Sequence, residues 1–361
     1  MSNRESLLYL NAIGLNHDEL NHICSTYENL DDIINNSNLL SNEYLIERGI
    51  KRKLEETGTG FDFDRYRTYM DNNEINYTTI YDPEYPKILK NIDDNPKLLY
   101  IKGCLNDNRP GIAVVGSRKC TEYGKWAVKK LVSDLGEYGV NIISGLALGV
   151  DKLAHVTAMN AGLKTIGVLG CGVDIIYPSS NRNVYERILE DNGAVISEFR
   201  LETPPLPFHF PLRNRIISGL SIGLLIIEAK EKSGTLITAN YAATQGKEVF
   251  SLPGNINSLY SKGTNALIRD GAKIITNVND IVDELPELKA IKENIAKINK
   301  DLSNLSDEEK IVYEQILVKS MSVDELSQSL KLQVSEILSV LTLLELKGMA
   351  SEVNSKWIIE F

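Results

Sequence analysis

Basic side chains stand beside small residues at two points where an apolar run of the sequence ends. Gly116, Ser117 and Arg118 follow the run at 111–115. The second group comprises Lys230, Lys232, Ser233, Gly234 and Thr235. Backbone amides at the start of a helix, together with the positive end of its dipole, favour a phosphate, and arginine adds a permanently charged donor. Each turn is therefore a candidate phosphate site. The alternative is that the glycine is present only because the turn requires it, and the basic residue beside each glycine makes this explanation weaker.

The stretch FHFPLRNRIISGLS places two arginines beside a segment that must be buried. Arg213 and Arg215 flank Asn214, and a guanidinium near a core needs an anionic ligand or a carboxylate partner, because an unpaired buried charge is too costly. A nucleic-acid phosphate is one candidate partner. A structural ion pair with Glu198 or Glu228 is the other, and the sequence favours neither.

Two further turns carry weaker signals. Ser144 and Gly145 end another apolar run and join the candidates for binding nucleic acid. Asp151 and His155 follow at helical i,i+4 spacing, but no nucleophile stands nearby in the sequence, which favours structural roles over an acid–base pair. The turn VLGCGVDIIYP has Ile175 where a dinucleotide fingerprint needs its third glycine, so we expect no dinucleotide cofactor. The turn at 230–235 lacks P-loop spacing, so triphosphate hydrolysis is not supported.

The apolar runs also indicate the architecture that must hold these turns. From Gly111 onward, seven short runs rich in β-branched residues alternate with helical stretches. Such runs are typical of strands buried on both faces, and their alternation with helices predicts a parallel sheet with right-handed crossovers. The predicted fold class is α/β, an extended Rossmann-like, doubly wound and mostly parallel sheet. Its ligands bind at the carboxyl ends of the strands, and several anion sites along one edge suit a strand of nucleic acid.

The segments on either side of this core differ from it in pattern. Apolar residues at helical spacing predict a small helical module, SAM-like or helix–hairpin–helix-like with Gly14 closing the turn, or else a plain helical bundle. At the other end, three helices and a final hairpin predict a winged-helix-like domain, in which Ser306 and Ser322 are N-caps. The predicted division is a helical domain at 1–65, an extended lead-in at 66–106, the core at 107–285, a linker at 286–304 and the winged-helix-like domain at 305–361.

The apparent recognition helix of that last domain, QVSEILSVLTLLELKG, carries almost no basic charge. A helix that reads DNA needs basic and polar side chains toward the groove. The sequence therefore favours a protein contact over DNA reading for this domain.

The formal net charge of −10 conceals an uneven distribution. Residues 107–285 carry 19 basic and 18 acidic side chains, whereas the flanks carry the remaining 20 and 31. The core thus carries nearly equal numbers of basic and acidic side chains, and the acidity of the whole chain does not exclude a nucleic-acid partner. The four scattered cysteines predict neither a metal site nor a disulfide framework, and no run is long enough to span a bilayer, so we expect a cytoplasmic protein with no membrane contact.

Six motifs occur in the order typical of the DNA-processing protein A family, also called DprA or Smf. These are GSR, SGLALGVDKLAH, FPLRNRIISGLS, EAKEKSGTLITA, SLPGN and GTNALIRDGA. The chain resembles that family over about residues 78–285. The resemblance implies a single-stranded DNA-binding protein without a cofactor or catalytic residues, which protects incoming strands and loads the RecA recombinase onto them during natural transformation. It also implies a homodimer that associates through the Rossmann core.

The same resemblance assigns roles to particular residues. Arg118 and Lys232 match the family's phosphate-gripping positions, and Arg213 and Arg215 match its RNR motif. The candidates for stacking on bases are Phe208, Phe210 and Tyr241. The competing class is a Rossmann-like nucleotide hydrolase of the phosphoribohydrolase type, which needs a catalytic glutamate where this chain has Thr238.

Overall fold

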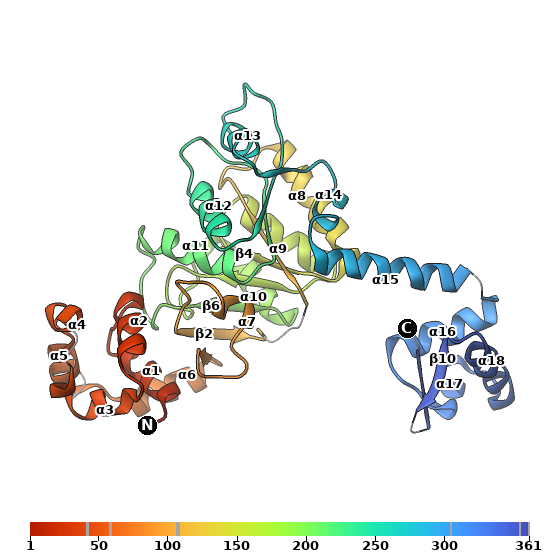
Figure 1. The fold of residues 1–361 in the computed structure, drawn as a ribbon, viewed down its shortest axis with the longest axis horizontal. Helices are drawn as coiled ribbons and strands as arrows, with labels where there is room; N and C mark the ends of the chain where they lie inside the picture. The colour runs from red at the N-terminus through yellow and green to blue at the C-terminus, as the bar shows by residue number, and fades with distance from the viewer. Residues whose placement is uncertain (41–42, 58–59, 106–108, 304, 354, 360–361) are drawn as a thin grey trace. The chain divides into compact units, whose positions relative to one another are not determined.

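The computed structural model describes residues 1–40, 43–57, 60–105, 109–303, 305–353 and 355–359. The chain forms two compact units, Met1–Leu288 and Lys289–Phe361 (Figure 1). Helix α15 (Pro286–Ser303) contains the division between them. The finer division of the first unit that the sequence predicts stays a prediction.

A nine-stranded sheet organises the first unit, in the spatial order β1-β2-β6-β5-β4-β3-β7-β8-β9. Strands β3 to β9 pair in parallel, whereas β2 pairs antiparallel with β6 and β1 pairs antiparallel with β2. The strands are β1 (Asn76–Thr79), β2 (Leu98–Gly103), β3 (Gly111–Val115), β4 (Asn141–Ser144), β5 (Thr165–Val168), β6 (Ala194–Ser197), β7 (Gly223–Ile226), β8 (Glu248–Ser251) and β9 (Lys273–Ile274). The predicted fold class, a mostly parallel doubly wound α/β sheet, is confirmed.

The central strands are buried along their whole length, as the apolar runs predict. All residues of β3, β4, β6 and β7 are buried. In β3, Ala113 and Val115 pack into one cluster with Ile216 and Ala239 of the covering helices. Helices α8 and α9 pack against each other, as do α11 and α12. The helices that follow the strands are α8 (Glu122–Asp134), α9 (Val150–Asn160), α10 (Arg182–Glu190), α11 (His209–Gly219), α12 (Gly234–Thr244), α13 (Lys262–Arg269) and α14 (Asn279–Val282).

The segment predicted as an extended lead-in contributes two strands to this sheet. β1 and β2 enclose the short helix α7 (Lys87–Lys90), and Tyr100 of β2 lies opposite Ser197 of β6. The N-terminal helices pack onto this side, where Leu7 and Leu10 share a cluster with Val195. Those helices are α1 (Asn3–Ala12), α2 (His17–Thr26), α3 (Leu30–Asn35), α4 (Glu43–Glu47), α5 (Ile50–Arg52) and α6 (Phe63–Asn72).

Beyond α15, the described part of the second unit forms three helices and a two-stranded hairpin, as predicted. Ser306 and Ser322 accept hydrogen bonds from the amides of Glu309 and Glu325 in capping boxes, which confirms both predicted N-caps. The elements are α16 (Asp307–Val318), α17 (Val323–Leu330), α18 (Val334–Leu346), β10 (Ala350–Val353) and β11 (Lys356–Ile359).

The order of strands in the sheet determines where a ligand can bind. From β3 the chain proceeds through β4 and β5 to β6 on one side, then returns to place β7, β8 and β9 on the other. The turns after β3 and β7 are therefore neighbours at the point where the winding reverses, which is where doubly wound sheets bind ligands. Both predicted phosphate-binding turns lie there.

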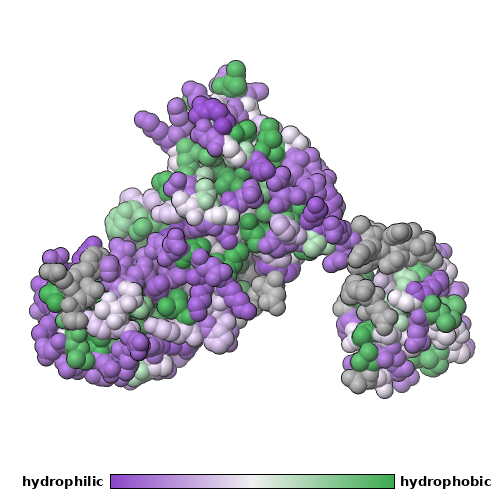
Figure 2. Space-filling model, in the orientation of Figure 1, coloured by the Kyte–Doolittle hydropathy of each residue, from purple (hydrophilic) through white to green (hydrophobic). Residues whose placement is uncertain are grey.

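The surface in the view of Figure 2 is mostly hydrophilic, with hydrophobic groups in small scattered patches. Across the described ranges, no helix is long and apolar enough to cross a membrane. The same residues contain no cluster of histidine, cysteine and acidic side chains suited to hold a metal ion.

Candidate nucleic-acid interface

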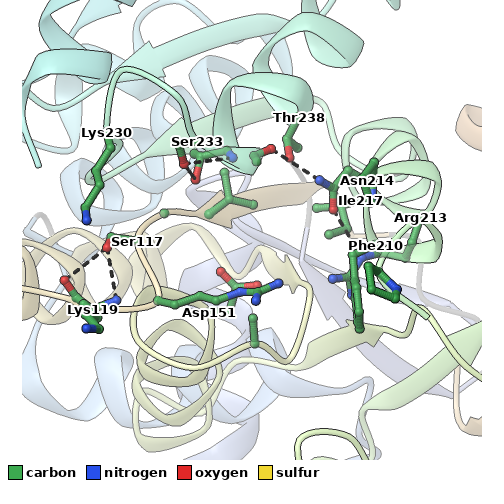
Figure 3. Close-up of a pocket in the computed structure, with 18 of the residues that line it drawn as sticks. Ser117, Lys119, Asp151, Phe210, Arg213, Asn214, Ile217, Lys230, Ser233 and Thr238 are labelled. Atoms are coloured by element: carbon green, nitrogen blue, oxygen red, sulfur yellow. Dashed lines mark hydrogen bonds between the residues drawn. The ribbon is translucent and has the colours of Figure 1, made fainter. Parts of the chain in front are cut away.

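The turns after β3 and β7 line a pocket with a volume of about 660 Å³. Figure 3 shows Lys119 and Lys230 at one end of it, and Phe210, Arg213 and Asn214 at the other. Of the described residues that line it, five are basic and one is acidic. They are Arg118, Lys119, Arg213, Lys230, Lys232 and Asp151.

Four of the five basic side chains are exposed, whereas Arg213 is buried. Among the described residues, no ion pair includes Arg118, Lys119, Lys230 or Lys232. Asp151 is buried, and its carboxylate accepts a hydrogen bond from the amide of Gly145 at 3.1 Å and is attracted by Arg213 and Arg118. The pocket is therefore an open, positively charged hollow that suits an anion.

The turn after β3 departs from the predicted geometry. Helix α8 begins at Glu122 with Thr121 as its N-cap, so Gly116, Ser117 and Arg118 do not form the start of a helix. Gly116 is required by packing instead, because a Cβ there would lie 2.7 Å from Cγ2 of Val150. A local hydrogen bond stabilises the loop, in which Ser117 Oγ accepts from the amide of Lys119 at 3.1 Å.

The Arg118 side chain is exposed and approaches an aromatic ring. Its guanidinium carbon lies 5.7 Å from the centroid of Phe210, a distance at which cation and ring attract each other. Phe210 lies 5.5 Å from the ring of Tyr177, tilted by 31°. The three side chains, with Arg213, line a smaller hollow of about 60 Å³ beside the main pocket. A charged donor and two rings thus face the same space.

The turn after β7 has the helix start that the sequence predicts. Helix α12 begins at Gly234, and Ser233 caps it by accepting a hydrogen bond from the amide of Thr235 at 3.2 Å. A Cβ at Gly234 would meet no atom within 4 Å, so space remains in front of this helix end. Lys230 and Lys232 stand just before it, which adds full positive charges to the dipole of the helix.

Arg213 links two loops beneath the pocket. Its Nη1 donates to the carbonyl of Gly145 at 2.8 Å and to the carbonyl of Val168. Burial lowers the pKa of Arg213 to about 10 and raises the pKa of Asp151, while the attraction between the two opposes both shifts. Arg213 therefore lines the pocket and also fixes the ends of β4 and β5. Asn214, the next residue, also lines the pocket.

Arg215 and Ser144 lie outside the pocket, contrary to the grouping that the sequence suggests. Arg215 is 1% exposed, and its Nη1 and Nη2 each lie 2.6 Å from an oxygen of Glu198, while Nε lies 3.0 Å from Asp94. The structural ion pair was one of two open alternatives, and it is the arrangement observed. Ser144 is fully buried and donates to the carbonyl of Val114 at 2.7 Å.

Most of the remaining candidates lie outside the pocket. Glu228 pairs with neither arginine and accepts a hydrogen bond from the amide of Thr121 at 3.0 Å. His155 is buried, with its Nδ1 2.7 Å from Thr165 Oγ1, and does not line the pocket. Of the three stacking candidates only Phe210 lines the pocket, whereas Phe208 and Tyr241 do not.

Two side chains of the pocket that could contact nucleic acid, Lys119 and Tyr177, are not among the residues predicted from the sequence. Lys119 immediately follows Arg118, and its basic charge beside a candidate turn was an available signal. Tyr177 lies in the turn VLGCGVDIIYP, which was tested only as a dinucleotide fingerprint. Its aromatic ring near the end of a strand was the feature that could have identified it.

Comparison with known proteins gives matches to both units. The family model described as DNA recombination-mediator protein A matches residues 76–286, and the model described as DprA winged helix domain matches residues 299–354. DNA processing protein DprA of Streptococcus pneumoniae is 44% identical over 207 residues, which are 57% of this chain and 73% of the relative. Protein Smf of Escherichia coli is 43% identical over 202 residues, covering 56% of this chain and 54% of the relative.

Two solved structures are similar to the chain. The X-ray structure of DprA from Streptococcus pneumoniae has a TM-score of 0.66 at 35% identity, covering 77% of this chain and 96% of that one. A structure of DprA from Helicobacter pylori, described in terms of its single-stranded DNA binding mode, has a TM-score of 0.53 at 33% identity. The match covers 60% of this chain and 96% of the Helicobacter pylori chain.

Proposed function

The chain belongs to the DNA recombination-mediator protein A family, and on this premise we propose that it binds single-stranded DNA in the pocket between the β3 and β7 turns. The observation that carries the proposal is a set of four exposed basic side chains around an open pocket, none of which forms an ion pair with a residue that the structure describes. These are Arg118, Lys119, Lys230 and Lys232. The Helicobacter pylori relative, whose description names single-stranded DNA binding, supports the same ligand class.

The chemistry of the pocket fits a single strand better than a small anion. Phosphates can bind the lysines and the helix start at Gly234, while Phe210 and Tyr177 offer ring faces to bases. Cations spread over both turns suit a backbone with a charge at every nucleotide. A duplex buries its base faces, so it cannot use the rings in this way.

We further propose the family's cellular role for this chain. It protects incoming strands and passes them to the RecA recombinase during natural transformation, as a cytoplasmic homodimer that associates through the sheet-containing unit. We propose no catalytic step, because Thr238 stands where a phosphoribohydrolase would need its glutamate, and the one carboxylate that lines the described pocket, Asp151, is buried against Arg213.

The test is a binding titration of the full chain with a labelled oligothymidylate and with a duplex. We expect the single strand to bind more tightly, with a logarithm of affinity that falls linearly with the logarithm of salt concentration. Lys232→Ala should weaken binding and lower the salt slope by about 0.7, the share of one phosphate contact. The matched control is Lys87→Ala, an exposed lysine that does not line the pocket. Equal affinities of the wild type and Lys232→Ala at every salt concentration would contradict the assignment.

A further inference from the structure

The outer face of α8 carries two exposed aromatic rings that stack on each other. Tyr123 is 44% exposed and Trp126 is 59% exposed. Their ring centroids lie 6.2 Å apart with an angle of 20° between the planes. Aromatic side chains of this size usually bury most of their surface. Across the described chain, Tyr123 is the only aromatic ring stacked with Trp126, so much of the tryptophan faces solvent.

The segment that carries these rings has a small excess of lysine, while Glu228 lines a hollow with Tyr123. Residues 119–134 carry four lysines and two acidic side chains, in a chain whose net charge is −10. Both acidic side chains form ion pairs within the helix, Glu122 with Lys125 at 2.6 Å and Asp134 with Lys130 at 2.8 Å. Lys129 has no ion-pair partner within the described ranges. Lysine is depleted at protein interfaces, whereas it is typical of surfaces that follow a phosphate backbone.

The aromatic pair follows the pocket-lining residue Lys119 closely along the chain. Lys119 lines the pocket, and the chain runs from it through the N-cap Thr121 directly into α8. The Tyr123 hydroxyl donates to the carbonyl of Pro253 at 2.8 Å, which fixes this ring to the loop that follows β8. Tyr123 is the second residue of α8 and Trp126 is the fifth, so both rings lie within about one and a half turns of the helix end that follows Lys119.

We propose that Tyr123 and Trp126 form a stacking platform for bases of the single strand outside the pocket, with Lys119 and Lys129 contacting its phosphates. This inference rests on the proposed function. Every base has a π-face, so such a platform binds unpaired bases with little regard to sequence. It lengthens the bound segment without requiring a second site, and a duplex gains nothing from it.

Tryptophan fluorescence tests the proposal directly. The chain has two tryptophans, and the other, Trp357, is buried in the second unit. In the full-length Trp357→Phe variant, Trp126 is the only emitting indole. We expect oligothymidylates to quench its emission in a length-dependent way over about 4 to about 16 nucleotides, the site sizes of single-strand-binding folds. Short strands should occupy the pocket without quenching.

Affinity measurements give the second readout. Trp126→Ala should weaken the longest oligothymidylate about tenfold and leave the shortest unaffected, because only the long strand reaches the platform. Tyr69→Ala, another exposed aromatic in the same unit, is the matched control and should change neither. Equal affinity of the variant for all lengths, or emission that long strands do not quench, overturns the platform. A change of oligomeric state without a change in affinity assigns the rings to a protein contact and also overturns it.

The two proposals fail in different ways. If the protein binds no single strand at any length, the proposed function is wrong, and the proposed stacking platform is wrong as well. If binding depends on Lys232 but not on Trp126, single-strand binding in the pocket is supported and only the stacking platform is wrong.

Discussion

Arg215 and Glu198 form a bidentate ion pair in the core, with two nitrogen–oxygen distances of 2.6 Å each. The arginine comes from α11, which also carries Phe210 and Arg213 into the pocket, while the glutamate follows β6. Arg215 also lies 2.9 Å from His17 of the N-terminal helices. The pair thus fastens the pocket's helix to the sheet and to the N-terminal region.

Breaking this pair from one side should cost stability rather than DNA affinity. Glu198→Gln leaves a guanidinium buried with reduced compensation, and removing one partner of a buried pair lowers the free energy of unfolding by about 3 kcal/mol. Urea unfolding measures this loss, and folded protein should retain its affinity because Arg215 does not line the pocket. As a control, Glu186→Gln removes an exposed pair with Arg182 and should cost less than about 1 kcal/mol. A stable variant with lost DNA affinity would contradict this division of roles.

The different environments of Arg213 and Arg215 could not be predicted from the sequence. Arg215 and Arg213 are alternate residues of one short motif with the same chemistry, and the sequence offered no reason to separate them. Their environments differ because α11 is a helix, which turns residues two apart to different sides. Glu198 and Glu228 were both named as partners, and only the folded sheet decides which lies within reach.

Prediction of the fold depended on how apolar each segment is. Strands β3 to β7 could be predicted because burial on both faces makes them continuous apolar runs. Strands β1 and β2 were missed because prolines and charged residues surround them, and β1 begins with exposed Asn76. The N-caps of the second unit were predictable because serine and glutamate three residues apart interact locally.

Arg118 should contribute both charge and shape to binding. Arg118→Ala removes a cation that has no acidic partner in the described structure and that lies over Phe210. We expect about a tenfold loss of affinity for a single strand, equivalent to about 1.4 kcal/mol. Arg118→Lys should recover only part of this loss, because lysine restores the charge without the planar fork. Fluorescence anisotropy at several salt concentrations measures both effects, and full recovery with lysine would mean that charge alone matters.

Stability should depend on pH through His155. Burial lowers the pKa of His155 from 6.5 to about 3, so the unfolded chain takes up a proton between these values that the folded chain does not. The free energy of unfolding therefore falls as the pH drops from 6.5 toward 3, by at most about 1.4 kcal/mol per pH unit from this group. His155→Gln should flatten the dependence while keeping an amide that can donate to Thr165. Urea unfolding at pH 7 and pH 5 measures the slopes, and parallel curves for the two proteins would contradict the assignment.

Gly145 should be intolerant of even one added carbon. A Cβ at this position would lie 2.7 Å from Nη2 of Arg213 and 2.8 Å from its Cζ, so Gly145→Ala must displace the buried guanidinium. The displaced group would lose its hydrogen bonds to the carbonyls of Gly145 and Val168 and would change the pocket wall. We expect the variant to lose about 2 kcal/mol of unfolding free energy and to bind single strands more weakly. Gly136→Ala is the matched control, because its Cβ would meet its nearest neighbour at an ordinary 3.7 Å. If both variants unfold at the same urea concentration as the wild type, Arg213 is not held as tightly as these contacts indicate.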